Sequence, residues 1–252
     1  MHFSTPVRLV VMLFMIAAGV NFSLYYALVR RRDVRSFRDA EFRLYLSLLA
    51  AAWLVVAIDV SVGAGGATAR RIFDAAFQVV SILTTTGFAT ADFAEWPSLS
   101  RATLVALMVF GGCAGSTAGG AKIIRLLIGW RAALREVRLT FNPSSVIAVF
   151  VGGRAVPEES VRSVVALLLL WMVAWGTGTL LLSVGDTGVV TAATGSLATL
   201  SNIGPGLASV GPNESFAFFA PWQKLVMVVL MWFGRLECFA LLALLQPQFW
   251  RR

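Results

Sequence analysis

The sequence predicts an all-α integral membrane protein made of repeats, in which a span, a short re-entrant helix and a polar segment are followed by a second span. Of the 252 residues, 58% are hydrophobic and 13% are charged, far from the balance of a soluble globular domain. Five apolar stretches are long enough to cross a bilayer. Two others are too short to cross and end in polar residues, so we expect two complete repeats preceded by one extra span.

The predicted spans cover residues 7–29, 44–62, 102–130, 161–184 and 221–250, of which the third and fifth contain interruptions. Each offers about 20 mostly apolar residues, the length that crosses a bilayer. The first span lacks a small-residue cleavage site, and its basic cluster follows the apolar run. A secretory signal peptide has the reverse arrangement, so we interpret this segment as a mature helix.

Arginine placement predicts the orientation. Basic residues gather between 30 and 43, between 125 and 162, and at Arg251 and Arg252, and they alternate with loops poor in Lys and Arg. The positive-inside rule then places these three clusters in the cytoplasm, with the N-terminus outside and the C-terminus inside. The net charge of +8 is explained in this way and does not indicate a nucleic-acid partner.

Few residues indicate enzyme or metal chemistry, and we expect no enzyme. Cys113 and Cys238 lie in apolar surroundings, which argues against a disulfide framework or a thiolate metal site. His2 is the only histidine and is terminal.

The two short apolar stretches, 72–83 and 188–200, both stop in a polar segment that contains glycine. These segments are Thr84, Thr85, Thr86, Gly87 and Phe88 in the first case, and Ser201, Asn202, Ile203, Gly204 and Pro205 in the second. Non-helical backbone at membrane depth is tolerated only when it is buried in protein or lines a watery cavity. A helix C-terminus carries partial negative charge, and rings of carbonyl and hydroxyl oxygens replace the hydration shell of a monovalent cation. The pattern therefore predicts a cation pathway.

This order of span, short helix, polar segment and span resembles the Trk/Ktr/HKT superfamily of potassium transporters, and in particular its TrkH-type membrane subunits. Four stretches carry the resemblance: SILTTTGFATADFAEWP, GGCAGSTAGGAKIIRLL, LSNIGPGL and WFGRLECF. The resemblance covers nearly the whole chain, as the C-terminal half of such a protein. It implies five transmembrane helices and two re-entrant pore helices in a bacterial inner membrane.

The resemblance also implies a division of the chain. Residues 1–40 would be the final span of an incomplete upstream repeat with its cytoplasmic loop. Residues 41–138 would be a pore repeat with its filter at 84–88 and a gating loop at 111–122. Residues 139–160 would connect the repeats in the cytoplasm, and 161–252 would be a pore repeat with its filter at 201–205.

Potassium is the transported ion that the resemblance implies, with no covalently bound cofactor. The expected K+ ligands are Thr85, Thr86, Asn202 and Ile203. Filters with a glycine in every repeat usually accompany potassium in this family, and Gly87 and Gly204 fit that in the two visible repeats. Sodium selectivity and coupling to H+ or Na+ stay open at this point.

A glycine-rich stretch, residues 111–122, interrupts the third predicted span. Each glycine costs about 1 kcal/mol relative to alanine in a helix interior, so several together predict an unwound segment. Close packing of small residues is an alternative, whereas a phosphate loop is disfavoured because Lys122 is followed by Ile123. The resemblance implies a movable gate that contains Gly111, Gly112, Gly115, Gly119 and Gly120, together with Arg235.

Arg235 is the residue of the sequence whose placement within the membrane costs the most free energy. It lies roughly 20 Å along a span that crosses about 30 Å of hydrocarbon, where an arginine costs at least about 2.5 kcal/mol. Glu237 is two positions away and does not share its helix face. A salt bridge to another helix is one interpretation. The resemblance implies instead that Arg235 projects into the pore below the filter as a barrier to cations.

The resemblance implies two protein partners, a TrkA-type cytoplasmic nucleotide-binding subunit and a second copy in a homodimer. Arg125 to Arg138 and the C-terminal arginines would contact the regulator, although membrane lipid headgroups explain basic residues equally well. Acidic residues at the external mouth, which could concentrate cations, are Asp92, Glu95 and Glu214.

Two other functions compete with ion transport. Asp59 and Asp186 faintly resemble an intramembrane aspartyl protease, but such an enzyme needs two carboxylates that share a proton at depth. The other alternative is a non-conducting fragment that needs an N-terminal half, because a pore of this family uses four filter segments and the chain supplies two.

Overall fold

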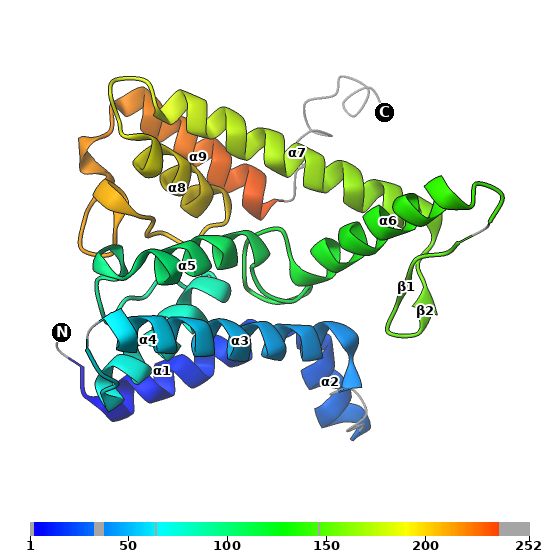
Figure 1. Cartoon of the computed structure of the whole chain (residues 1–252), viewed down its shortest axis with the longest axis horizontal. Coiled ribbons are helices and arrows are strands. Elements are labelled where there is room, and N and C mark those ends of the chain that lie inside the picture. Colours follow the sequence, from blue (N-terminus) through cyan, green and yellow to red (C-terminus); the bar gives the residue numbers. More distant parts are fainter. Residues whose placement is uncertain (1–2, 33–37, 64, 146, 237–252) are drawn as a thin grey trace.

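The computed structural model describes residues 3–32, 38–63, 65–145 and 147–236, which leaves His2, Glu237, Cys238, Arg251 and Arg252 outside the described residues. This part of the chain is mainly helical, as predicted (Figure 1). The helices are α1 (Thr5–Ala18), α2 (Phe22–Arg31), α3 (Ala40–Gly63), α4 (Ala69–Leu83), α5 (Ser98–Phe110), α6 (Ile123–Phe141), α7 (Glu158–Leu182), α8 (Val189–Leu200) and α9 (Pro221–Arg235). Smaller elements are an antiparallel hairpin of β1 (Phe150–Val151) and β2 (Arg154–Ala155), and the 3-10 turns η2 (Phe93–Glu95), η3 (Ala208–Val210) and η4 (Phe216–Phe218).

The helices form two groups. α3, α4 and α5 pack on one another, and so do α7, α8 and α9. The groups occupy the lower and upper parts of Figure 1, and a contact between α5 and α8 joins them. The main hydrophobic core runs across this junction and includes Leu83, Leu104, Leu200 and Leu230.

The two short helices end where the sequence predicts, at Leu83 and Leu200. With 15 and 12 residues, α4 and α8 are about 22 Å and 18 Å long, too short for about 30 Å of hydrocarbon. Almost every residue in the last two turns of each helix is buried. They are therefore interior helices, whose polar ends must find partners inside the protein.

By length and composition, two helices of the described part qualify as membrane spans, α3 and α7, and a third is added if α1 and α2 are counted as one bent span. Residues 102–130 divide into α5, a non-helical loop and the start of α6. α9 supplies only the first half of the fifth predicted span, because the remainder lies beyond the described residues.

The prediction of one continuous helix over residues 7–29 is wrong, because α1 and α2 meet at 91°. Asn21 explains the new start, since its side-chain oxygen accepts the N–H of Ser23 at 2.9 Å and so caps α2. Gly19 provides room at the bend: a Cβ there would lie 2.6 Å from the Tyr45 hydroxyl.

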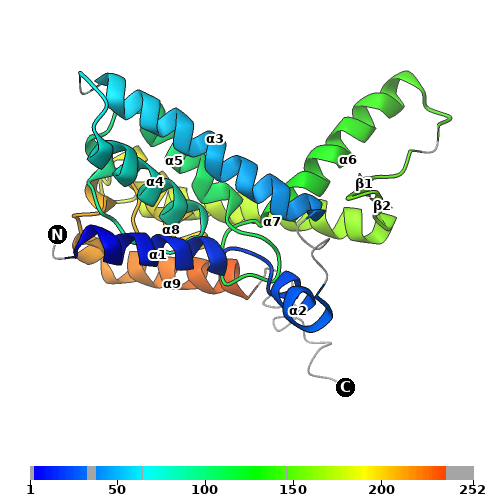
Figure 2. The same cartoon turned by 90° about the horizontal axis from the view of Figure 1, so that it is seen from below.

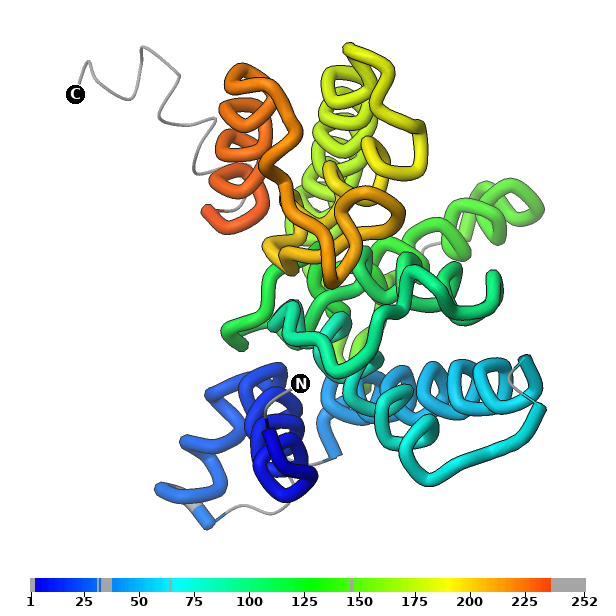
Figure 3. Tube along the Cα trace, turned by 90° about the vertical axis from the view of Figure 1, so that its left-hand side faces the viewer, coloured from blue at the N-terminus to red at the C-terminus, as the bar shows by residue number. Residues whose placement is uncertain are grey.

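The connections that follow α4 and α8 lie at the opposite end of the molecule from α2, the outer part of α6 and the hairpin (Figures 1 and 2). Figure 3 faces the end with these connections, which lie beside each other near its centre. A hydrogen bond of 2.9 Å from the Asn213 amide to Asp92 Oδ2 joins them. The outer part of α6 and the hairpin lie at the far end, and these elements contain predicted cytoplasmic residues such as Arg131 and Arg154.

Candidate functional site

The polar segments 84–88 and 201–205, here the first and second polar segments, have the same backbone course. Each begins with a helix cap of ordinary right-handed geometry, Thr84 or Ser201, and continues with a residue at positive φ. The N–H groups of Thr86 and Ile203 both donate to a carbonyl five residues earlier, at 2.9 Å and 2.8 Å. The two short helices therefore end in one shared turn, although the residues differ.

The two polar segments touch each other. A Cβ built on Gly87 would lie 2.0 Å from the carbonyl oxygen of Ile203, and Gly87 has φ +80°. Only glycine fits both the close approach and this backbone angle. The two segments are thus in direct contact, at a point where no side chain separates their backbones.

The three threonines of the first segment differ in their hydrogen bonds. The Thr84 hydroxyl donates to Val80 O at 2.8 Å and lies 2.9 Å from the Thr86 hydroxyl. The Thr85 hydroxyl accepts the N–H of Gly119 at 2.7 Å. The side chains that the sequence predicts as ion-lining therefore make protein contacts.

The backbone carbonyl groups of the two segments, unlike the threonine hydroxyl groups, have no hydrogen-bond donor among the described residues. Among the hydrogen bonds within the described residues, none ends on a main-chain carbonyl oxygen of 84–88 or 201–205. The carbonyl oxygens of Thr85, Thr86, Asn202 and Ile203 thus keep their lone pairs for another ligand. A polar group inside a membrane protein is costly unless it is satisfied, which favours a cation or water there.

The glycine-rich segment 111–122, here the gate loop, is non-helical as predicted. Gly111, Gly115 and Gly120 have positive φ values of 66° to 72°. A Cβ on Gly119 would lie 2.1 Å from the carbonyl oxygen of Ser201. Since Gly119 also donates to Thr85, the tip of the gate loop contacts both polar segments.

Arg235, the last residue of α9, reaches the gate loop. Its Nη1 donates to the carbonyl oxygen of Thr117 at 2.7 Å, and its side chain is exposed. None of the ion pairs found among the described residues includes it. Gly234 lets α9 approach closely, because a Cβ there would lie 1.7 Å from Leu200 O at the end of α8. Arg235 and the gate loop therefore belong to one cluster.

The bend between α1 and α2 is a second support of the gate loop, which sequence reasoning missed. Three main-chain hydrogen bonds join them: Cys113 N to Gly19 O at 3.0 Å, Thr117 N to Ala18 O at 3.3 Å, and Phe22 N to Gly115 O at 3.0 Å. A Gly followed closely by Asn within the apolar run was the available signal, since both residue types favour a helix end.

Glu41 is a further residue that sequence reasoning missed. It lies near the start of α3, is only 6% exposed, and accepts the N–H of Ala114 at 2.6 Å through Oε1. A carboxylate that accepts a main-chain N–H makes a strong, charge-assisted hydrogen bond. The sequence offered little signal, because a glutamate in the first turn of a helix usually just complements the helix dipole.

The acidic residues outside the cluster have structural roles or lie in solvent. Asp59 Oδ2 accepts both the N–H and the hydroxyl of Ser100, at 2.8 Å and 2.6 Å, and so caps the start of α5 from a neighbouring helix. Asp186 is exposed in the turn after α7. Asp59 is thus committed to a helix cap, which removes the basis for an aspartyl protease pair.

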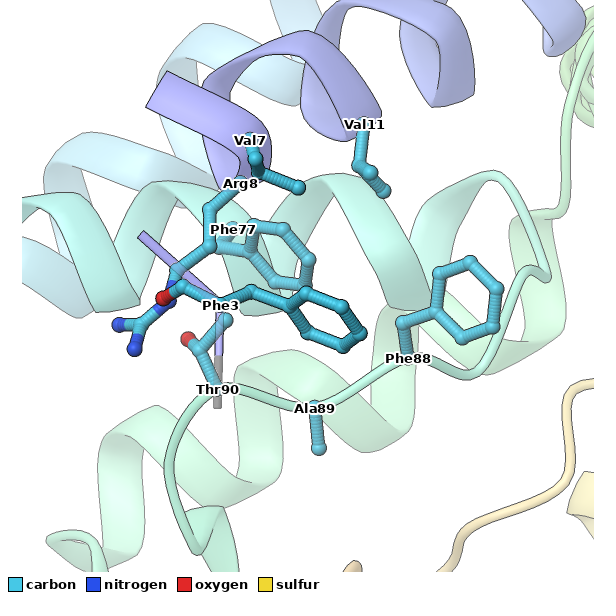
Figure 4. A pocket seen from close by; sticks show the side chains of 8 residues that line it. All are labelled: Phe3, Val7, Arg8, Val11, Phe77, Phe88, Ala89 and Thr90. Carbon is cyan, nitrogen blue, oxygen red and sulfur yellow. The ribbon is translucent and has the colours of Figure 1, made fainter. Parts of the chain in front are cut away.

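An apolar pocket of about 460 Å³ lies between α1 and the exit of the first polar segment (Figure 4). Phe3, Phe77 and Phe88 provide aromatic rings, and Val7 and Val11 line it from α1. This lining suits hydrocarbon and not a hydrated cation, so the pocket is distinct from the candidate ion pathway.

Comparison with known proteins agrees with this geometry. The family described as "TrkH: Cation transport protein" matches residues 1–251. The Trk system potassium uptake protein TrkH of Salmonella typhimurium is 34% identical over 99% of this chain and 52% of its own length. The Trk system potassium uptake protein TrkG of Escherichia coli is 30% identical over 97% of this chain and 50% of its own length.

A solved structure is similar over the same range. The crystal structure of the potassium transporter TrkH from Vibrio parahaemolyticus superposes with a TM-score of 0.89 at 33% identity, over 99% of this chain and 54% of that one. The chain thus spans about half the length of these relatives. Its shared architecture, and a family match that covers nearly every residue, place this chain in the TrkH family of cation transport proteins.

Proposed function

We propose that this chain forms half of the potassium pathway of a Trk-type uptake system, with K+ as its cargo. The observation that carries the proposal is the contact between Gly87 and Ile203, which brings together two polar segments of matching backbone. Similar proteins named as potassium uptake proteins add to it. The activity proposed is transport, with no chemical step.

Potassium enters such a site by exchanging water for protein oxygens. We assign this role to the carbonyl oxygens of Thr85, Thr86, Asn202 and Ile203, with Gly87 and Gly204 allowing the backbone turns. The C-termini of α4 and α8 end at these segments, and each contributes partial negative charge that favours a cation. Thr84, Phe88, Ser201 and Pro205 complete the two segments.

The gate loop is proposed to close this pathway. Its tip at Gly119 contacts both polar segments, and Arg235 adds a positive charge next to it. A cation passing the polar segments would meet main chain and a guanidinium group in place of water. Withdrawal of the loop would remove both obstacles, and its glycines permit the backbone changes that this requires.

The proposed setting is a bacterial inner membrane, with the N-terminus outside and the C-terminus in the cytoplasm. A TrkA-type nucleotide-binding subunit and a second copy of the chain are the proposed protein partners, beside membrane lipid. The predicted regulator contacts divide into two kinds. Arg135 is held by Glu158 at 2.6 Å, whereas Arg138 is exposed on α6 and available to a partner.

Rubidium uptake tests the proposal in bacterial cells that lack their own potassium uptake systems. The cells would express this chain alone, the N-terminal half of a relative alone, or both together. Uptake that requires this chain, whether alone or with the other half, supports the potassium pathway. No uptake above the empty-vector control in any combination, with both halves present in the membrane, would support the non-conducting alternative.

A further inference from the structure

Thr85 is unusual among the three consecutive threonines of the first polar segment. The hydroxyl groups of Thr84 and Thr86 interact with each other, and Thr84 also bonds Val80 within α4. The Thr85 hydroxyl instead accepts a hydrogen bond of 2.7 Å from Gly119, 34 positions later in the chain. One hydroxyl of the three therefore links the polar segment to the gate loop.

The backbone of Thr85 points to a special requirement. Its φ is +55°, in the left-handed region that a β-branched residue adopts only under strain. The equivalent residue of the second polar segment is Asn202, with φ +56°, and asparagine is favoured in this region. A threonine at position 85 is thus disfavoured by its local backbone conformation. The hydrogen bond from Gly119 explains why a residue with a hydroxyl group is found there.

The comparison with Asn202 extends to the side chains. The Asn202 amide donates to Met231 O at 3.2 Å and so ties the second polar segment to α9. Thr85 ties the first polar segment to the gate loop, which interrupts the span that follows this segment. In both repeats, the residue at positive φ connects the polar segment to the element that follows it.

We propose that the Thr85 hydroxyl is the latch that holds the gate loop against the first polar segment. The inference rests on the proposed function of the loop as a gate. When Gly119 withdraws, the Thr85 hydroxyl loses this hydrogen bond, while the backbone of Thr85 stays strained. The docked position of the gate loop is therefore the state in which the bond compensates for the strain. Thr85 is a positioning residue in this role, and acts through the gate loop.

Hydrogen exchange of the purified chain tests the latch directly. Thr85→Val removes the hydroxyl but keeps the size and the branch, so exchange in residues 111–122 should rise about 2- to 13-fold, the range that one hydrogen bond is worth. Thr85→Ser keeps the hydroxyl and should exchange like the original chain. Thr86→Val is the matched control, because the hydrogen bond found for that hydroxyl goes to Thr84. Thr85→Ala gives the same test if the valine variant does not fold.

Equal exchange in Thr85→Val and Thr85→Ser would overturn the latch, because the hydroxyl would then not matter. Faster exchange in Thr86→Val, as large as that in Thr85→Val, would also overturn it, since the whole segment would then have loosened. Rubidium uptake separates this result from the proposed function: a working latch predicts more uptake through Thr85→Val than through Thr85→Ser. A lack of uptake in every variant counts against the potassium pathway, while the exchange data still decide whether the hydroxyl holds the loop.

Discussion

Replacement of Arg235 by alanine should favour the withdrawn state of the gate loop. The residue contributes one hydrogen bond from a charged donor, from Nη1 to Thr117 O at 2.7 Å. Such bonds are worth about 1.5–3 kcal/mol, and the exposure of this side chain places the value near the lower end. Because about 1.4 kcal/mol is a tenfold change in an equilibrium, the ratio of withdrawn to docked loop should rise about tenfold.

Initial rates of rubidium uptake into proteoliposomes, normalised to protein content, measure this effect. The preparation should contain whichever combination of chain and N-terminal half conducts. Arg235→Ala should raise the rate by up to about tenfold, since the loop is released and a positive charge leaves the pathway. Arg235→Lys keeps the charge, so a smaller increase in that variant would separate the contact from the electrostatic barrier.

Lys224 provides a matched control on the same helix. Its ammonium group donates to Ala217 O at 2.9 Å, but at the opposite end of α9 from the gate loop. Lys224→Ala should therefore leave the rate within about twofold of the original, as expected for an exposed contact. Equal rates in the original chain, Arg235→Ala and Lys224→Ala would refute the reasoning, and failure of Arg235→Ala alone to fold would favour a structural role for the arginine.

Three further substitutions test the surroundings of the gate. Gly87→Ala should lower rubidium uptake at least about tenfold, because the new Cβ would lie 2.0 Å from a carbonyl oxygen of the second polar segment. Glu41→Ala leaves a gate-loop N–H without its acceptor, a loss of about 1–3 kcal/mol, and the melting temperature should fall by about 2–4 °C for each kcal/mol. Asp59→Ala removes the cap of α5 and should cost about 0.5–2 kcal/mol in the same melting assay, with uptake per folded molecule unchanged.

Each of these substitutions has its own control. Gly176→Ala adds a methyl group in α7 that would meet no described atom within 4 Å apart from its chain neighbours and its own helix backbone, and normal uptake is expected. Glu41→Gln and Asp59→Asn keep a side-chain oxygen as acceptor and should melt closer to the original chain. Normal uptake through Gly87→Ala, or equal melting temperatures within either pair, would contradict the roles assigned here.

Local sequence patterns were enough to predict the short helices and the broken third span. Their signals are local: an apolar run of fixed length that stops at Thr84 or Ser201, and glycines that weaken a helix between 111 and 122. Arg235 was found because a charge at depth is costly wherever its partner lies.

The partners of these residues could not be predicted from the sequence, because they depend on contacts between distant parts of the chain. Thr84, Thr85 and Thr86 look alike in the sequence, yet Thr85 alone bonds the gate loop. Glu41 and Ala114 are 73 positions apart, and no local pattern joins them. The 91° bend at Gly19 was missed because hydropathy measures the length of an apolar run and not its direction.

The way the gate loop is attached to the bend between α1 and α2 limits how it can move. All three of those hydrogen bonds run between backbone atoms, so substitutions other than proline leave their donors and acceptors in place. α2 begins directly after this bend. A displacement of α2 therefore either moves residues 113–117 with it or breaks these hydrogen bonds. A movement of α2 is therefore transmitted to the gate loop, whose Gly119 lies against Thr85 and Ser201.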